Sequence, residues 1–127
     1  MIPSVIKAST ASRLATAKAA DVLSIYIGKA GGIAPAWEMA TAGRLPATIG
    51  SNLELGIGSA AMTHFALATP SVVAEAFPCD IIGPFYYEAE LLTEPLSLQG
   101  GMARPPDRPG LGVMLDDAAV ARYTVRT

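Results

Sequence analysis

The chain has 127 residues, of which 51% are hydrophobic and only 16% are charged, and its formal net charge is -2. This composition excludes a disordered or collagen-like protein, and 9 Lys and Arg residues against 11 Asp and Glu argue against a basic surface for nucleic acid. A small domain has a large surface for its volume, so this low charge content is typical of a segment inside a larger structure.

Residues 10–82 alternate between helix and strand patterns. Alanine-rich stretches favour helices, and β-branched runs favour buried strands. The expected elements, in chain order, are a helix over 10–18, a strand over 21–27, a helix over 36–42, a strand over 47–49, a helix over 60–68 and a strand over 79–82. We expect the glycine-rich segment 28–32 to break the chain after the first strand, and Ser59 to cap the third helix.

The spacing of these strands indicates parallel βα units, because parallel neighbours need a crossover helix. Three parallel strands cannot close a barrel, and an eight-stranded βα barrel needs about 200 residues or more. The predicted fold class is therefore α/β, as the C-terminal part of a TIM-like (β/α) barrel, with about three βα units plus a tail.

The pattern changes after Pro84. Residues 96–99 and 102–104 flank a Gly-Gly pair and predict a β-hairpin, and Asp116 is expected to cap a last helix over 117–123. We divide the chain into two parts. Residues 1–92 would hold the C-terminal βα units of the barrel. Residues 93–127 would form a tail that carries the hairpin and the last helix and packs back on the barrel or its cap.

Five sequence blocks, in the same order, resemble the C-terminal part of the enolase superfamily, in its mandelate racemase and muconate-lactonizing branch. The blocks are residues 24–33, 50–61, 80–84, 94–96 with 100–101, and 109–113. The first three are similar to the segments at the sixth, seventh and eighth barrel strands, and the others to the C-terminal tail. Together they extend over nearly the whole chain.

The resemblance implies a full-length parent enzyme with a capping domain, a modified (β/α) barrel and a Mg²⁺ ion. Such enzymes remove the proton next to the carboxylate of a small substrate, and the metal stabilises the resulting enediolate. The parent would be a racemase, epimerase, cycloisomerase or dehydratase, with a preference for amino or imino acids such as hydroxyproline. We expect it to form a homo-oligomer.

Two departures from the family pattern stand out. The metal-binding carboxylates of the family lie on the third to fifth strands, before residue 21, and residues 1–20 hold no Asp or Glu. We therefore expect no metal ligands in this chain and no activity of the chain alone. The family also often carries a catalytic lysine three residues before the lysine of its Lys-x-Gly-Gly turn. Here the turn lysine is Lys29, and the earlier position is Tyr26.

Tyr26 is the candidate catalytic residue, as a phenol that donates or relays a proton or binds substrate. The alternative is an aromatic residue that covers the barrel rim. For Lys29 the favoured interpretation is a loop cation that pairs with a carboxylate or with helix carbonyls.

The candidate substrate-binding residues are Glu54, Asp80, Ser51 and Asn52, which follow the seventh strand or end the eighth. Ordinary loop contacts are the alternative for each of them. His64 is expected to be a packing residue, because no second ligand stands at metal-binding spacing.

Two other classes of function are alternatives to a part of an enzyme. The chain could be a non-catalytic truncated product, or a half-barrel that needs a complementary fragment. A nucleotide site at Gly56-Ile57-Gly58 is disfavoured, since the third glycine of the dinucleotide fingerprint is missing. We expect no membrane span and no signal peptide. The single cysteine, Cys79, fits a cytoplasmic protein.

Overall fold

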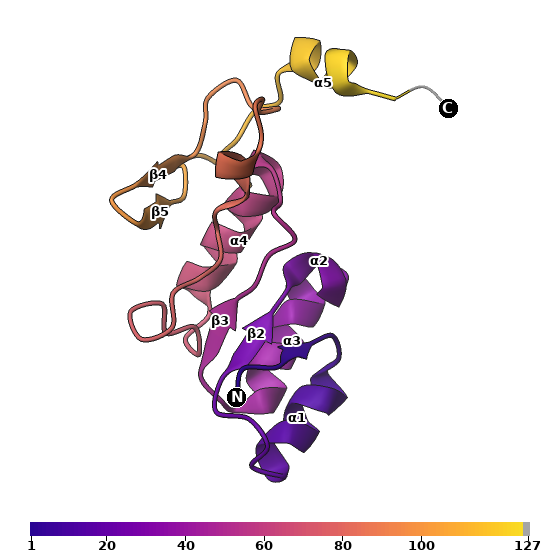
Figure 1. Cartoon of the computed structure of the whole chain (residues 1–127), viewed down its shortest axis with the longest axis vertical. Helices are drawn as coiled ribbons and strands as arrows, with labels where there is room; N and C mark the ends of the chain where they lie inside the picture. The colour runs from indigo at the N-terminus through magenta and orange to yellow at the C-terminus, as the bar shows by residue number, and fades with distance from the viewer. Residues whose placement is uncertain (126–127) are drawn as a thin grey trace.

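The computed structural model describes residues 1–125, and a three-stranded parallel sheet lies in its N-terminal half (Figure 1). The strands are β1 (Ser4–Val5), β2 (Leu23–Ile25) and β3 (Ala47–Ile49), in the order β1-β2-β3. Their register aligns Ser4 with Ser24 and Ser24 with Thr48. This sheet confirms a parallel α/β architecture.

Four helices connect and follow the strands: α1 (Ala8–Thr16), α2 (Ile27–Ala30), α3 (Ile33–Gly43) and α4 (Gly56–Ala68). The apolar strand residues Leu23 and Ile25 are fully buried, since a parallel sheet is covered on its faces by crossover helices. Helix α3 lies close to β2 because Gly43 has no side chain, and a Cβ there would overlap Leu23. The core of the molecule lies between this sheet and its helices.

The N-terminal elements differ from expectation in two places. Strand β1 was not predicted, because two residues are too short to form a periodic pattern. The glycine-rich segment predicted as a break begins with the short helix α2, which ends at Gly31 in the left-handed conformation (φ 92°). The expected strand over 21–27 is therefore shortened to Leu23–Ile25.

The strand predicted over 79–82 is wrong. This segment lies beside β3 through the Asp80 N–H, which donates to the Ile49 carbonyl at 2.8 Å, but it forms no strand. The β3 edge is instead completed upstream by a parallel bridge between Ala47 and Val72. The apolar run from Cys79 to Ile82 therefore gives an extended segment that ends in the 3₁₀ helix η1 (Gly83–Tyr86).

Helix α4 begins three residues before the expected Ser59 cap, with Leu55 at its N-cap position. The N–H of Gly56 in the first turn donates to the Glu90 carboxylate at 2.9 Å. Ser59 is buried, and its hydroxyl donates to the Glu54 carbonyl at 2.8 Å. A partner 34 residues away thus satisfies a backbone donor of the first turn, in place of a local side-chain cap.

The tail holds an antiparallel hairpin, β4 (Ser97–Gln99) with β5 (Met102–Arg104), and helix α5 (Asp117–Tyr123). Both predictions are confirmed, and the Asp116 side chain accepts hydrogen bonds from the N–H groups of Ala118 and Ala119. Helix α5 lies at the far end of the molecule from α1 (Figure 1). Positions 126 and 127 of the expected tail lie outside the described residues.

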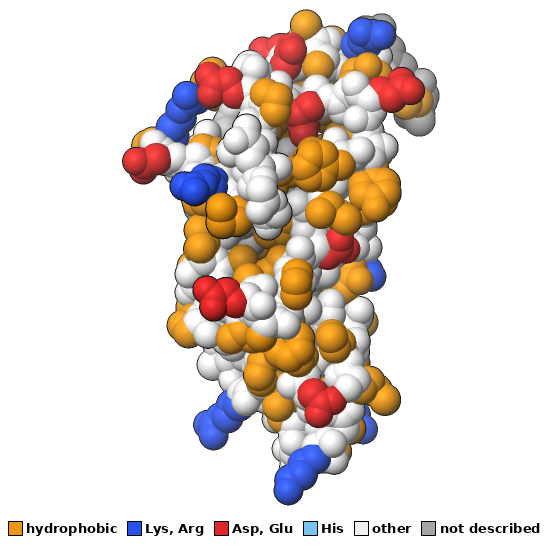
Figure 2. All heavy atoms as spheres, turned by 60° about the vertical axis from the view of Figure 1, so that its left-hand side comes forward, with side chains coloured by type: hydrophobic (Ala, Val, Ile, Leu, Met, Phe, Trp, Pro, Cys, Tyr) orange, Lys and Arg blue, Asp and Glu red, His pale blue; other side chains and the backbone are white. Residues whose placement is uncertain are grey.

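Hydrophobic side chains are spread over the middle of the face in Figure 2. Near the start of the chain, the N-terminal ammonium of Met1 pairs with the exposed Asp21 carboxylate. That hydrogen bond, and then the positive charge itself, lower the pKa of Asp21. In residues 1–125, no helix combines the length and hydrophobicity that crossing a bilayer requires.

Candidate functional site

Polar side chains gather where β2 and β3 end. Tyr26 directly follows β2, and the loop from Gly50 to Glu54 directly follows β3. The backbone hydrogen bond to Ile49 holds Asp80 beside the same end of β3. Because the carboxyl ends of parallel strands share one edge of the sheet, these residues form one candidate site, which we call the carboxyl-edge site.

Tyr26 is half-buried, and its ring lies over Gly50. A Cβ at Gly50 would overlap the ring and lie 2.6 Å from the Ser24 hydroxyl oxygen. Gly50 does not adopt a positive φ, so the close approach of these side chains, rather than the backbone, requires glycine here. The ring of Tyr26 is thereby placed across the carboxyl end of β3.

Lys29 lies on α2 and contacts Tyr26. Its Nζ is 3.7 Å from the centroid of the Tyr26 ring, within the range of a cation–π contact. The sequence predicted that Lys29 would pair with a carboxylate or with helix carbonyls. In the described part of the chain, ion pairs involve only Met1 with Asp21 and Arg108 with Glu94.

Ser51 connects the loop after β3 to Asp80. Its hydroxyl donates to Asp80 Oδ2 at 3.0 Å and accepts a hydrogen bond from the Leu53 N–H at 3.2 Å. The structure therefore brings together two residues that the sequence placed on separate strand ends. Both side chains are half-buried, and each remains accessible in part to a ligand.

Glu54 is held by its own loop. Its carboxylate accepts hydrogen bonds from the Asn52 backbone N–H at 2.8 Å and from Asn52 Nδ2 at 3.4 Å. Glu54 Oε1 would lie 3.7 Å from a Cβ at Gly28, which places the carboxylate beside helix α2. Gly83 packs directly on the Glu54 backbone, so η1 lies against this loop and supports its conformation.

The carboxyl-edge site thus contains one ammonium, one phenol and two carboxylates. Such a set can bind a small charged ligand, and the phenol can donate a proton within hydrogen-bond reach. A Mg²⁺ ion needs near-octahedral oxygen ligands, and residues 1–125 contain no group of three or more His, Cys, Asp or Glu side chains that could hold a metal. The described residues therefore do not fit a complete Mg²⁺ site by themselves.

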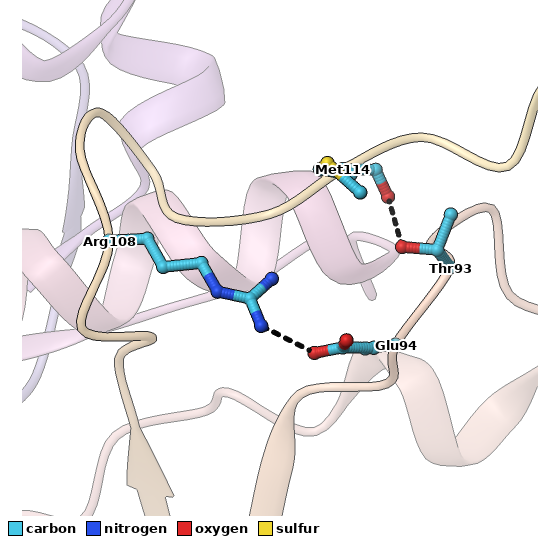
Figure 3. A network of polar contacts seen from close by, with 4 residues as sticks. All are labelled: Thr93, Glu94, Arg108 and Met114. Atoms are coloured by element: carbon cyan, nitrogen blue, oxygen red, sulfur yellow. Dashed lines mark hydrogen bonds and ion pairs between the residues drawn. The ribbon is translucent and has the colours of Figure 1, made fainter.

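Two further polar features lie outside this site. His64 Nε2 is 3.2 Å from the Leu111 carbonyl, as expected for a packing histidine. In the tail, Arg108 donates to Glu94 at 3.1 Å, and Thr93 contacts the Met114 carbonyl (Figure 3). The two tail contacts join the segment at Thr93 and Glu94 to the segment from Arg108 to Met114. Neither contact involves a residue of the carboxyl-edge site.

Lys29 is the residue whose contact sequence reasoning missed. The signal was available in its spacing from Tyr26, because residues three apart share one side of a helical turn. The glycine-rich segment predicts a break rather than a helix, so the sequence analysis does not place the two side chains in contact.

Comparisons with known proteins place this geometry in context. A profile of the family described as "Enolase C-terminal domain-like" matches residues 4–119. Muconate cycloisomerase 1 of Rhodococcus opacus is 36% identical over 109 residues, which are 84% of this chain and 28% of that enzyme. A probable glucarate dehydratase of Streptomyces coelicolor is 44% identical over 71 residues, or 56% of this chain and 16% of the relative.

Among solved structures, muconate lactonizing enzyme from Pseudomonas putida superposes with a TM-score of 0.86 at 26% sequence identity. The match covers 96% of this chain and 35% of the solved one. The chain therefore spans about a third or less of the length of these relatives.

Proposed function

The chain belongs to the enolase C-terminal domain-like family, as the C-terminal part of the barrel, and from this premise we propose that it supplies one side of an active site. The complete site would remove a proton α to the carboxylate of a small substrate, as a racemase, epimerase, cycloisomerase or dehydratase. The observation that carries this proposal is the convergence of Tyr26, the Ser51–Asp80 pair and Glu54 at one carboxyl edge, where barrel enzymes hold their active groups.

Tyr26 would act on the reacting proton or contact the substrate. It stands at the strand position where the resemblance places a catalytic lysine in many relatives. A phenol in that place can donate or relay a proton, which suits a one-base or dehydrating mechanism. The packing of its ring over Gly50 supports this role by restricting where the hydroxyl can lie.

The loop after β3 would bind the polar groups of the substrate. Ser51, Asn52, Glu54 and Asp80 offer hydroxyl, amide and carboxylate groups at the same edge. Two carboxylates suit a substrate that carries an ammonium or iminium group, which supports an amino or imino acid such as hydroxyproline.

Mg²⁺ is the cofactor we propose for the full-length parent, where it would stabilise the enediolate. Residues 1–125 hold no group of three or more side chains that could bind a metal, so the ion would take its ligands from outside the described residues. On this basis the 127-residue chain alone is expected to be inactive.

The test is a chimera in which residues 4–119 replace the matching segment of Rhodococcus opacus muconate cycloisomerase 1. We expect Mg²⁺-dependent exchange of the substrate α-proton in D₂O with at least one of a panel of amino, imino and dicarboxylic acids, measured by NMR. Glu54→Gln should lower this exchange at least ten-fold. Glu38→Gln, on the exposed side of α3, is the matched control and should leave it unchanged.

Two results would contradict the proposal. One is a folded, Mg²⁺-loaded chimera that exchanges no α-proton from any carboxylate in the panel. The other is Mg²⁺-stimulated exchange by the purified 127-residue chain, which would contradict the need for further ligands.

A second candidate is a non-catalytic product or a half-barrel that pairs with a complementary fragment. Exposed apolar residues Ile2 and Ile6 flank β1 at the outer edge of the sheet, and unpaired strand edges readily take another strand. A cooperatively melting, monodisperse monomer in size-exclusion chromatography with light scattering would count against this function.

We propose that residues 1–92 form the barrel part and residues 93–127 a tail that packs on the barrel or its cap. The parent would be a cytoplasmic homo-oligomer that binds neither nucleic acid nor membrane. The single cysteine and the near-neutral charge support this view.

A further inference from the structure

Lys29 is carried to the carboxyl-edge site by the shape of α2. This helix begins directly after Tyr26 and is closed by Gly31, so Lys29 stands one turn beyond Tyr26. The lysine side chain folds back until Nζ lies 3.7 Å from the ring centroid. A positive charge therefore stands over the phenol at the end of β2.

The other charged side chains of the site already have hydrogen-bond partners. The Glu54 carboxylate accepts from Asn52, and the Asp80 carboxylate accepts from Ser51. Lys29 makes no ion pair with either carboxylate in the described part of the chain. An ammonium group has three N–H donors, and the face of an aromatic ring attracts its charge without accepting a conventional hydrogen bond.

We propose that the ammonium of Lys29, supported by the ring of Tyr26, binds the anionic group of the ligand at the carboxyl-edge site. The choice of a carboxylate as that group rests on the function proposed above. The ring holds the ammonium at the edge of the sheet, and the ammonium donates to a carboxylate oxygen. Lys29 is then a ligand-binding residue, and Tyr26 positions it in addition to any contact of its own.

The experiment is an NMR titration of the 127-residue chain with succinate as the probe. Succinamide, which has the same length and no charge, and sodium chloride at equal ionic strength are the controls. We expect the ε-CH₂ resonances of Lys29 to shift and saturate with succinate alone. Those of Lys18 should not saturate, because Lys18 lies between α1 and β2, on the side of the sheet where the strands begin rather than where they end.

Variants then assign the contact. Lys29→Gln should weaken succinate binding at least five-fold, measured on the backbone amides of Gly50 and Ser51, and Lys18→Gln should leave it unchanged. Lys29→Arg keeps the charge and should stay within two-fold. Tyr26→Leu should weaken binding about two- to five-fold, the equivalent of an exposed cation–π contact of about 0.5–1 kcal/mol.

Several outcomes would overturn the inference. These are equal shifts with succinamide, an unshifted Lys29 in the wild-type chain, or unchanged affinity in Lys29→Gln. The wild-type titration decides the question even where a variant does not fold. Lys29-dependent succinate binding without proton exchange in the chimera would defeat the proposed function alone. Exchange that is insensitive to Lys29→Gln, with no succinate shift at Lys29, would defeat this inference alone.

Discussion

The sheet region, residues 4–68, and the tail, residues 93–125, are held together by different forces. In the sheet region, side chains such as Leu23 and Met39 are almost completely buried between strands and helices. In the tail, helix α5 has no buried residue, and the connection between Glu94 and Arg108 is an exposed ion pair. Exposed ion pairs contribute little to stability, whereas buried apolar side chains contribute most of it.

The difference shows where each region obtains its conformation. The sheet region depends on close approach between elements, at positions such as Gly43 and Gly50 where a side chain would overlap a neighbour. Apart from the hairpin residues Leu98 and Ala103, which pack against the core, the tail depends on local features, such as the left-handed glycines of the β4–β5 turn and the Asp116 cap. Substitutions should therefore act globally in the sheet region and locally in the tail.

The largest expected effect is that of Leu23→Ala. Removal of a fully buried leucine from β2 leaves a cavity, and we expect the free energy of unfolding to fall by about 2–5 kcal/mol, measured by urea denaturation. Leu115→Ala in the tail is the control, with a change of about 0.5 kcal/mol or less, because that side chain is 47% exposed. An equal fall in the free energy of unfolding in the two variants would contradict the difference between the two regions.

Gly50→Ala should have the next largest effect. The added methyl group overlaps the Tyr26 ring, and overpacking of this kind costs about 1–3 kcal/mol of unfolding free energy. Gly28→Ala is the matched control, since its Cβ would only reach ordinary contact with Glu54. In a Tyr26→Ala background, Gly50→Ala should cost less, and strictly additive changes in this double-mutant cycle would refute the packing argument.

Asp116→Ala tests the local character of the tail. Loss of its two hydrogen bonds should destabilise α5 by about 1 kcal/mol, which amide hydrogen exchange at Ala118 and Ala119 can measure. The urea midpoint of the whole chain should not move, because none of the residues of α5 is buried. Asp117→Ala removes only a first-turn charge and should change exchange less. A large shift of the global midpoint would show that α5 supports the core.

The smallest effect concerns the pH dependence of Asp21. Its pKa is lowered in the folded chain by the Met1 ammonium, so its stabilising contribution is present above the unfolded pKa and is lost as pH falls through the folded pKa. Asp21→Asn should therefore lower the melting temperature slightly at pH 7, and the difference from wild type should shrink as the pH falls below the ordinary pKa of an aspartate and vanish below the lowered pKa of folded Asp21. A difference that grows in acid would have the wrong sign.

Local patterns in the sequence predicted several elements well. Strand β3 and helix α5 have the predicted limits, because an apolar run between turns and an Asp cap are encoded in neighbouring residues. The end of α4 before Pro70 was also predicted. These features need no knowledge of distant contacts.

The errors arise where a distant partner decides the structure. Helix α4 starts at Gly56 because Glu90 accepts its N–H, a contact that no local pattern contains. The run from Cys79 to Ile82 has the composition of a strand, yet it gains only the Asp80 bond to Ile49. For the site, the positions of Tyr26 and Glu54 after β2 and β3 followed from the parallel order, whereas Asp80 is held there by its hydrogen bond to Ile49 and ends no strand. The contact of Lys29 with Tyr26 depends on helix α2, which the sequence did not predict because this segment is rich in glycine.

The contact between Tyr26 and Gly50 also links what each of these two positions can accept. With the Tyr26 ring in this place, a Cβ at position 50 overlaps the ring, so either the ring or the backbone has to move. A change at position 50 and a change at position 26 should therefore not be independent in their effects on stability. A larger residue at 50 should be tolerated best together with a smaller residue at 26.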